Sequence, residues 1–278
     1  MSALAVMTNS GSLRAMSNLS STTRALNKTI GRLSSGLRVE SAADDAAGLA
    51  VTENMRAQMR GYQQAVRNTN DGISILQTAE SAYQSISDTL IRMRELAVEA
   101  ANDSLSDTER GFLDTEFQDL ADEITRISDV TEFNGISLLD GTAGDAGTMT
   151  FQVGTRNTVN DRITVALDDQ DAAALGVDVS AVDDRTNAQN AIDEIDLALE
   201  SLNTDRSVLG STISSLNTAV TNLSTTVENY GTSMGQIRDA DIGAESAEFA
   251  RFQVLQQAGV AMLSQANALP NLALRLLG

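Results

Sequence analysis

Carboxylates are the side chains of this sequence best able to do chemistry, and two of them adjoin in the segment SAADDAAGLAV. Asp44 and Asp45 would suit general acid and base catalysis if a nucleophile, a metal or a dry pocket lay beside them. The neighbouring residues supply none of these. Ser41 and Asp44 instead match the residue types that cap helix N-termini and complement the helix dipole. We therefore predict that this segment begins a helix.

Other catalytic arrangements fail for lack of the necessary residues. Gly141, Gly144 and Gly147 are spaced like a phosphate loop, but no Gly-Lys-Ser/Thr follows, so we expect a flexible connection there. The sequence contains no Cys and no His, which removes cysteine nucleophiles, the Ser-His-Asp triad and zinc sites built from those ligands. We predict a protein that is not an enzyme, with no catalytic, metal-binding or cofactor-binding residues.

The composition favours long helices over a compact catalytic core. Trp is absent, Pro occurs once in 278 residues, and aromatic residues make up 3%. The apolar residues are mostly Ala, Leu, Val and Ile, which suit helix–helix packing. The fold class that we expect is therefore mainly α and elongated.

Charge is distributed unevenly along the chain. The formal net charge is −19, yet the segment 1–42 has one acidic residue, Glu40, against Arg14, Arg24, Lys28, Arg32 and Arg38. The acidic interior argues against nucleic acid as a partner of the whole chain. The basic segment could contact a membrane or RNA, but the polar face of a helix in a larger assembly is the interpretation that we favour.

The N-terminal sequence does not resemble a cleavable secretion signal. It lacks the positively charged and continuous apolar regions of such a signal. No stretch reaches the length of about 18 apolar residues that a membrane span needs. If the protein leaves the cell, it therefore needs another exporter, and no membrane-spanning segment is expected.

The strongest pattern is a heptad repeat in the second half of the chain. From Ile192 to Ile237, positions spaced alternately three and four residues apart are apolar or aromatic, except for Arg206. A stripe this narrow must pack against another helix to be shielded from water. We expect Arg206 to reach a carboxylate of that partner helix. The predicted packing seam comprises Leu199, Leu209, Ile213, Leu216, Val220 and Leu223, with Leu90 and Met93 on the partner helix.

The first half of the chain supplies the partner helix. The same alternation runs through residues 55–76, is interrupted at Ala79 and resumes over residues 83–97. The interruption resembles a stammer, which changes the supercoil locally. Ser106-Asp-Thr-Glu109 is a capping box that predicts the start of a third helix. Phe133-Asn134-Gly135 is a turn signal that ends the helical region.

A β-hairpin is expected at 148–168. Apolar residues alternate strictly at Met149, Phe151 and Val153, and again from Ile163 to Leu167, on either side of a polar turn. Alternation with a period of two residues is the pattern of a strand that is buried on one face.

The two ends of the chain differ from the regions between them. Residues 1–42 and 240–278 have broken apolar periodicity and many Ser, Asn and Ala residues. We expect them to form helices only on assembly, because alone they bury too little apolar surface to offset the entropy of ordering. The order of long helices, hairpin and long helix brings these two ends together antiparallel, as a rod-shaped subunit requires.

Several segments together resemble bacterial flagellin across nearly the whole chain. Each is weakly diagnostic, but their number and order are specific. They are TNSGSLRAMSNL, LSSGLRVESAADDAAGLAV, RNTNDGISILQTAE, IRMRELAVEAAND, EFNGISLLDG, FQVG and the C-terminal RDADIGAESAEFARFQVLQQAGVAMLSQANALPNLALRLLG. The variable outer domains of many flagellins are missing, because the heptad helix resumes soon after Leu167, so the chain resembles a minimal flagellin.

The resemblance implies a secreted structural subunit that polymerises with itself into the extracellular filament for swimming motility. It also implies a terminal helical domain formed by residues 1–42 and 236–278, and an antiparallel coiled-coil rod domain over 43–235. A hook-filament junction protein, which shares the terminal helices, is the alternative. The implied partners are the flagellar type III export apparatus, a cytosolic chaperone on the C-terminal segment, and the hook-associated and cap proteins. The implied polymerisation helices contain Leu33, Leu37, Phe249, Phe252, Leu255 and Met262.

The resemblance also implies a contact with a host receptor. IRMRELAVEAAND matches the flagellin segment contacted by the vertebrate Toll-like receptor that senses flagellin, which would place Arg92 and Leu96 in that contact. Glu116 matches the acidic position that completes it. Leu96 lies off the predicted packing seam, so we expect it to be an exposed apolar residue.

Overall fold

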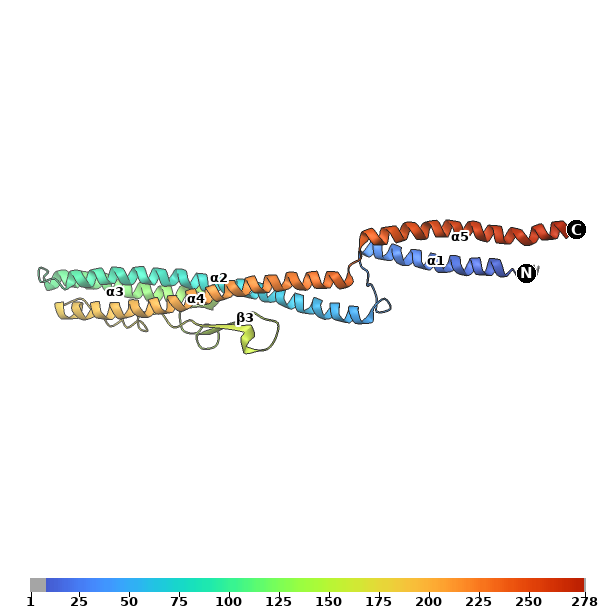
Figure 1. Cartoon of the computed structure of the whole chain (residues 1–278). Helices are drawn as coiled ribbons and strands as arrows, with labels where there is room; N and C mark the ends of the chain where they lie inside the picture. Colours follow the sequence, from blue (N-terminus) through green and yellow to red (C-terminus); the bar gives the residue numbers. More distant parts are fainter. Residues whose placement is uncertain (1–8, 278) are drawn as a thin grey trace. The chain divides into compact units, whose positions relative to one another are not determined.

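The computed structural model describes residues 9–277, with side chains described up to residue 268. The fold is mainly α, with short antiparallel hairpins, as predicted. Its helices are α1 (Ser10–Ser35), α2 (Ala46–Ala100), α3 (Asp107–Val130), α4 (Arg185–Arg238) and α5 (Ile242–Leu277). Its strands are β1 (Glu132–Phe133), β2 (Ile136–Ser137), β3 (Thr148–Gln152) and β4 (Arg162–Ala166). Figure 1 labels the main elements.

The chain divides into two compact units. The terminal unit comprises residues 1–57 and 229–278, and the central unit comprises residues 58–228. These boundaries fall inside α2 and α4. Of the boundaries predicted from sequence, residue 42 lies between α1 and α2, and residue 236 lies in the last turn of α4. That division into functional domains stays a prediction.

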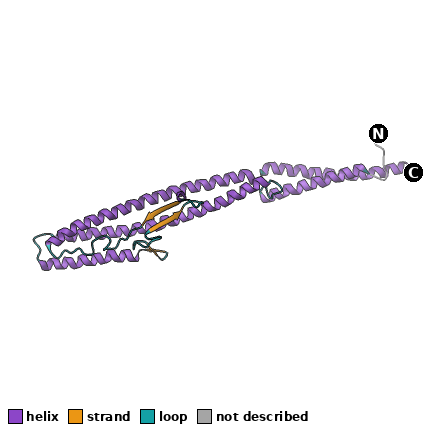
Figure 2. Cartoon of the chain, turned by 90° about the horizontal axis from the view of Figure 1, so that it is seen from below, coloured by secondary structure: helices purple, strands orange, loops and turns teal. Residues whose placement is uncertain are grey.

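The core of the central unit lies between α2, α3 and α4. Figure 2 shows α2 and α4 running side by side, and charged side chains of α2 reach both α3 and α4. The segment that follows β4, residues 167–182, covers this core and is called here the connecting segment. Its own buried apolar residues are Leu167, Ala172, Val177 and Val182. The central unit is therefore a helical bundle closed on one side by an irregular segment.

The helix starts follow the side chains that precede them. α3 begins after Ser106, which forms with Glu109 the capping box that the sequence predicts. For α2 the prediction was wrong in detail. Asp45, not Asp44, accepts the hydrogen bond of Gly48 N, at 2.8 Å, while Asp44 accepts from Ser41 and pairs with Lys28 Nζ at 2.6 Å. These two contacts lower the pKa of Asp44 to about 2, with the Lys28 contact the larger cause.

The predicted β-hairpin at 148–168 is confirmed. β3 pairs with β4 in antiparallel register, with Phe151 opposite Ile163. A second hairpin, β1–β2, was not anticipated beyond its turn signal. Asn134 and Gly135 form its turn with φ values of 53° and 78°. Positive φ at both central residues is the signature of a type I′ turn, which matches the twist of the strands it joins.

The β3–β4 hairpin packs directly against α2. A side chain on Gly72 would place its Cβ 2.8 Å from Phe151 Cδ1, and one on Gly61 would lie 2.8 Å from Thr155 Cγ2. Glycine at these two helical positions therefore permits the close approach of the hairpin. Asn68 lies between them along the chain, and its side-chain amide donates to Gln152 O at 3.5 Å.

In the terminal unit, α1 and α5 pack against each other along their length. Leu26 and Thr29 of α1 are buried, and Asn9 caps α1 while donating from Nδ2 to Ala266 O at 2.8 Å. The described residues of both terminal segments thus form helices in this structure, apart from the links next to α2 and α4. The expectation that they need neighbouring subunits to become ordered concerns their stability and stays a prediction.

The link that follows α1 and the link that precedes α5 are hydrogen-bonded to each other at one end of the helix pair. Gly36 ends α1 in the left-handed conformation, and Leu37 forms an isolated antiparallel bridge with Asp239 between α4 and α5. The Arg38 guanidinium donates to Ile237 O, and the Ala240 N–H donates to Gly36 O. Leu37 therefore lies in a link, and its expected place in a terminal helix is wrong.

Candidate assembly surface and the core that supports it

The predicted packing seam lies along the buried side of α2 and α4. Leu90, Met93, Leu209 and Leu216 are fully buried, and Leu223 is 9% exposed. Leu199, Ile213 and Val220 are half-buried at the edge of the core. The fully buried positions of α4 recur every seven residues from Ile195, and Ala191, Ala198 and Thr212 fill the places between them.

The small residues beside these leucines have a structural reason. α4 faces α2 and also lies beneath the connecting segment, so its contact surface is broader than the narrow seam between two helices. Alanine at 191 and 198 permits a close approach on this side of the helix. Apolar periodicity does not separate this arrangement from a simple two-helix coil, because alanine is common on both faces of long helices.

Arg206 occupies the one polar position of the heptad series, and the expectation for it is confirmed. Its guanidinium donates from Nη2 to Glu80 Oε1 of α2 at 2.8 Å and to Gln84 Oε1 at 2.8 Å. The aliphatic stem covers the core edge while the charged group stays near solvent. The repeat therefore tolerates an arginine without leaving a buried charge unpaired.

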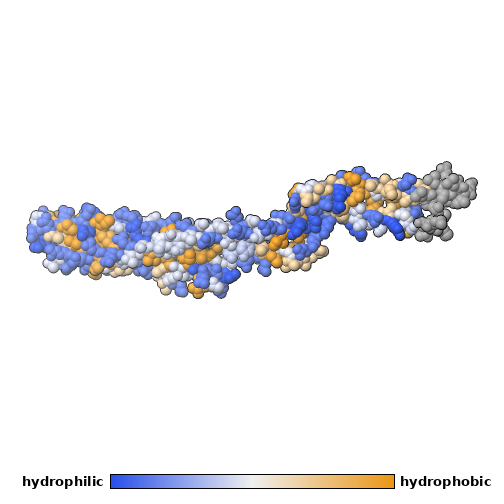
Figure 3. Space-filling model, in the orientation of Figure 1, coloured by the Kyte–Doolittle hydropathy of each residue, from blue (hydrophilic) through white to orange (hydrophobic). Residues whose placement is uncertain are grey.

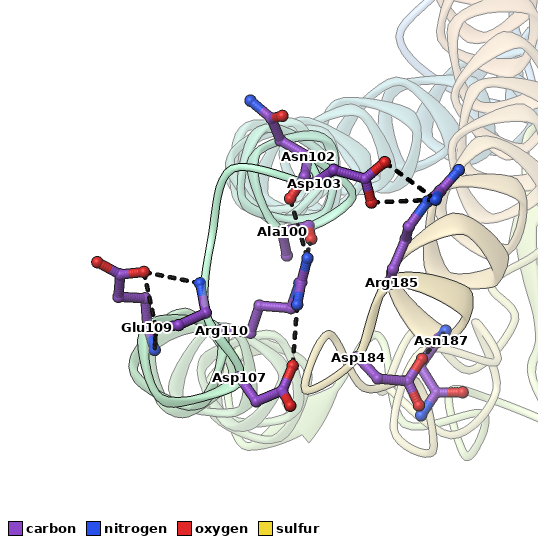
Figure 4. Close-up of polar contacts among 10 residues, drawn as sticks. Ala100, Asn102, Asp103, Asp107, Glu109, Arg110, Asp184, Arg185 and Asn187 are labelled. Carbon is purple, nitrogen blue, oxygen red and sulfur yellow. Dashed lines mark hydrogen bonds and ion pairs between the residues drawn. The ribbon is translucent and has the colours of Figure 1, made fainter.

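Arg110 is a residue that sequence reasoning missed, and it joins α3 to the end of α2. Its side chain is buried, and its Nε donates to Ala100 O at 2.8 Å while its Nη2 donates to Asn102 O at 2.9 Å. Figure 4 shows the guanidinium between these carbonyls and Asp107. The last turn of α2 contains no basic residue of its own. Arg110 therefore supplies both the hydrogen bonds and the positive charge that a helix C-terminus favours.

The start of α4 lies beside the same turn. The Asp184 carboxylate accepts from Asn187 N at 2.9 Å, which caps α4, and Arg185 pairs with Asp103 at 3.0 Å across to the α2–α3 turn. Figure 4 shows the two groups facing each other. These contacts hold three helix ends together at one end of the central unit.

Of the three residues of the implied receptor contact, two are exposed in the structure and one is buried. Arg92 and Glu116 are both about half exposed, and Arg92 Nη2 lies 2.7 Å from Glu116 Oε1. The Glu116 and Glu95 carboxylates raise the pKa of Arg92. Leu96, however, is 1% exposed. The expectation of an exposed leucine was wrong, because α2 packs against α3 as well as α4 and so buries two faces.

The exposed apolar side chains of α1 and α5 form the candidate assembly surface. On α1 they are Leu13, Met16 and Ile30, and on α5 they are Ile242, Val254, Leu255, Val260 and Met262. Leu33, Phe249 and Phe252 are half-buried beside them, and Arg251 lies over the Phe252 ring at 4.9 Å. Figure 3 shows apolar residues mixed with polar ones over this pair. So many exposed aliphatic groups on one helix pair indicate a surface that another molecule covers.

The described part of the chain contains no metal-binding cluster and no helix that could span a membrane. No described cluster of acidic side chains is placed to hold a metal ion. Within the same residues, no helix has a stretch apolar enough to cross a bilayer. A cavity of about 310 Å³ lies between α1 and α5 and is lined by Lys28, Arg32, Glu245, Glu248 and Phe252 among others.

A terminal helix pair with many exposed apolar side chains indicates a subunit of a larger assembly. Comparison with known proteins identifies the assembly. The family model of the bacterial flagellin N-terminal helical region matches residues 6–144, and that of the bacterial flagellin C-terminal helical region matches residues 192–277. The chain belongs to the bacterial flagellin family, and it is a structural subunit of the flagellar filament, an extracellular appendage.

Individual relatives agree over nearly the full length. The chain is 42% identical to a flagellin of Halalkalibacterium halodurans over 252 residues, covering 90% of this chain and 91% of the relative. It is 38% identical to a flagellin of Bacillus subtilis over 300 residues, covering 97% and 98%. A flagellar filament core protein of Brachyspira hyodysenteriae is 36% identical, covering 91% and 92%.

Solved structures share the fold. The crystal structure of Bacillus cereus flagellin is similar with a TM-score of 0.50 and 35% identity, covering 56% of this chain and 88% of that one. A flagellar hook-associated protein from Vibrio parahaemolyticus has a TM-score of 0.57, covering 70% of this chain and 100% of that one. Its identity of 16% shows a common fold alone. The hook-associated alternative therefore gains no support.

Proposed function

We propose that the chain polymerises through the α1–α5 pair, whose exposed apolar side chains pack between neighbouring subunits. The observation that carries this proposal is the row of exposed aliphatic residues on both helices, with Met262 64% exposed and Val254 63% exposed. Covering apolar surface lowers the free energy by about 25 cal/mol for each Å², so contacts between subunits favour the burial of these side chains. Contacts between unlike surfaces of successive subunits generate an open helix.

The test compares the dilute monomer with seeded filaments. Electron microscopy should show long filaments growing from added seeds, and a protease should trim both chain ends of the monomer while sparing them in the filament. The ends are expected to be protected because their apolar groups are covered only after assembly. Equal protection in the dilute monomer, with filaments still forming, would show that the terminal helices are stable alone.

The proposed division of the chain follows from this role. Residues 1–42 with 236–278 serve polymerisation, and residues 43–235 form the coiled-coil rod that supports them. The protein acts as structural material and not as an enzyme, which fits the absence of Cys and His from the sequence. The hook-associated and cap proteins are the partners expected at the two ends of such a filament.

Export and protection before assembly form a further part of the proposed function. The chain leaves the cell through the flagellar type III apparatus, and a cytosolic chaperone covers the C-terminal segment until then. The proposal of a chaperone is supported by α5, because its exposed Val254, Leu255 and Val260 would otherwise contact water in the cytosol. A chain truncated before α5 should lose binding to the purified chaperone, whereas binding retained by that truncation would place the chaperone elsewhere.

We also propose that the monomer engages the flagellin-sensing Toll-like receptor through Arg92 and Glu116. Their side chains are exposed and joined in one ion pair. Arg92→Ala and Glu116→Ala should each lower receptor signalling without changing thermal stability. Leu96→Ala should lower signalling as well, but together with the melting temperature, because Leu96 is buried.

The matched control for the receptor experiment is Arg126→Ala. Arg126 is exposed on α3 and pairs with Glu123 of its own helix. Removing it changes the surface charge by the same amount as removing Arg92. If Arg92→Ala and Glu116→Ala signal like the parent, or if Arg126→Ala loses signalling equally, the transfer of the receptor contact to this chain is wrong.

A further inference from the structure

A cluster of buried polar side chains lies where the connecting segment meets α2 and α4. Gln170 of the connecting segment is 2% exposed, and Tyr83 of α2 is 0% exposed. Gln170 Nε2 donates to Asp205 Oδ2 of α4 at 2.9 Å, and Gln170 N donates to Leu139 O at 2.9 Å. Gln170 Oε1 and Tyr83 Oη are both buried without a hydrogen-bond partner among the described residues. The amide oxygen thus lacks a donor and the phenol hydroxyl lacks a partner of either kind, which is a costly arrangement.

The charges around Asp205 are negative. The charge of Asp168 in the connecting segment raises the pKa of Asp205, and the charge of Glu80 in α2 contributes to the raised pKa of Tyr83. Glu80 is paired with Arg206 at 2.8 Å, whereas Asp205 takes part in no ion pair in the described part of the chain. Burial and the Asp168 charge raise the pKa of Asp205, against the opposing effect of the Gln170 hydrogen bond. Burial is likewise the main cause that raises the pKa of Tyr83.

A proton on Asp205 would relieve both features at once. It removes a half-buried negative charge that forms no ion pair in the described part of the chain, and it turns a group that can only accept hydrogen bonds into one that can also donate. The proton comes from solvent and forms an O–H bond on the carboxyl group, and no other bond changes. The oxygen it can serve is Gln170 Oε1: when the amide turns about its last bond, Oε1 accepts from the new hydroxyl, and Nε2 gives up its bond to Asp205 Oδ2 in exchange.

We propose that Asp205 is a proton-binding residue that tightens the hold of the connecting segment on α2 and α4 as the pH falls. A group whose pKa is raised by folding stabilises the fold fully below its unfolded value, here 3.8. That stabilisation is lost as the pH rises through the folded pKa. The inference concerns the stability of the single subunit and does not depend on how subunits assemble.

The experiment begins with the parent protein as a monomer. A carbon-13 NMR titration of the Asp205 carboxyl group should give a pKa above 3.8. Each unit of upward shift corresponds to a tenfold larger folding equilibrium constant in the protonated form, relative to the ionised one. A midpoint at or below the ordinary value would overturn the proposal without the use of any variant.

Variants then separate this residue from the other carboxylates. Asp205→Asn should raise the melting temperature at pH 7, slow proteolytic cleavage within residues 167–182, and have no such effect at pH 4. The control is Asp193→Asn, which removes the same charge from an exposed position of the same helix. The same rise for both variants, or an unchanged pH profile in Asp205→Asn, would overturn the proposal.

A metal ion could satisfy the same oxygens, because carboxylate, amide and phenol oxygens suit hard cations. The parent should therefore be melted in sodium chloride, potassium chloride and choline chloride at equal ionic strength. Equal melting temperatures in the three salts are expected for a proton site. Stabilisation that depends on sodium or potassium at constant pH would make the cluster a metal site and overturn the inference.

Discussion

Replacing Leu216 by alanine is expected to lower the free energy of unfolding by about 2–5 kcal/mol. The side chain is 0% exposed in α4, and its truncation removes apolar contacts and leaves a cavity that a rigid helical bundle fills only in part. Urea unfolding of the monomer, followed by circular dichroism, measures the loss.

The control for this experiment lies on the same helix. Leu197 is 66% exposed, so Leu197→Ala removes the same atoms from the surface, and its cost should stay within about 0.5 kcal/mol. A Leu216→Ala protein that unfolds at the same urea concentration as the Leu197→Ala protein would mean that α4 does not contribute its buried face to the core.

The second large effect is expected for Arg110→Ala, at about 2–4 kcal/mol of unfolding free energy. The substitution leaves the carbonyls of Ala100 and Asn102 without their charged donor and removes the positive group at the end of α2. Arg110→Lys should recover only part of the loss, because an ammonium group cannot reproduce the planar fork that serves both carbonyls.

Arg126→Ala is the matched control, since Arg126 lies on the same helix and also pairs with a carboxylate three residues away. Exposed pairs of this kind contribute about 0–1 kcal/mol. Hydrogen exchange at the end of α2 would locate the effect, because protection there should fall in Arg110→Ala alone. If both arginine variants lose the same stability, Arg110 acts as a surface charge and not as a cap.

The sequence predicts the features of this fold that depend on local pattern. The capping box at Ser106, the alternation at Phe151 and the polar heptad position at Arg206 each depend on short spacings whose geometry is fixed. The hairpin and the third helix follow from them. The family resemblance, in turn, rests on the order of many segments and locates the terminal helices.

What the sequence could not predict depends on contacts between distant segments. Leu96 looks like a surface residue from the α2–α4 heptad, and the second packing partner that buries it is a property of the bundle. Arg110 looks like half of an exposed i,i+3 pair, because nothing in the chain near it reveals that α2 ends beneath its guanidinium. Choosing between Asp44 and Asp45 as the cap also required the position of Lys28, which comes from another helix.

The sequence separations between contacting helices determine the order in which we expect the chain to fold. Arg92 meets Glu116 across 24 residues of sequence, Arg94 meets Asp196 across 102, and Asn9 meets Ala266 across 257. Each doubling of a flexible loop adds about 0.6 kcal/mol to the entropy cost of closing it. We therefore expect α2 and α3 to pair first as a local helical hairpin, α4 to join next, and α1 to meet α5 last. The two helices of the candidate assembly surface would then be the last to find each other within their own chain, and this delay leaves time for a neighbouring subunit to meet them first.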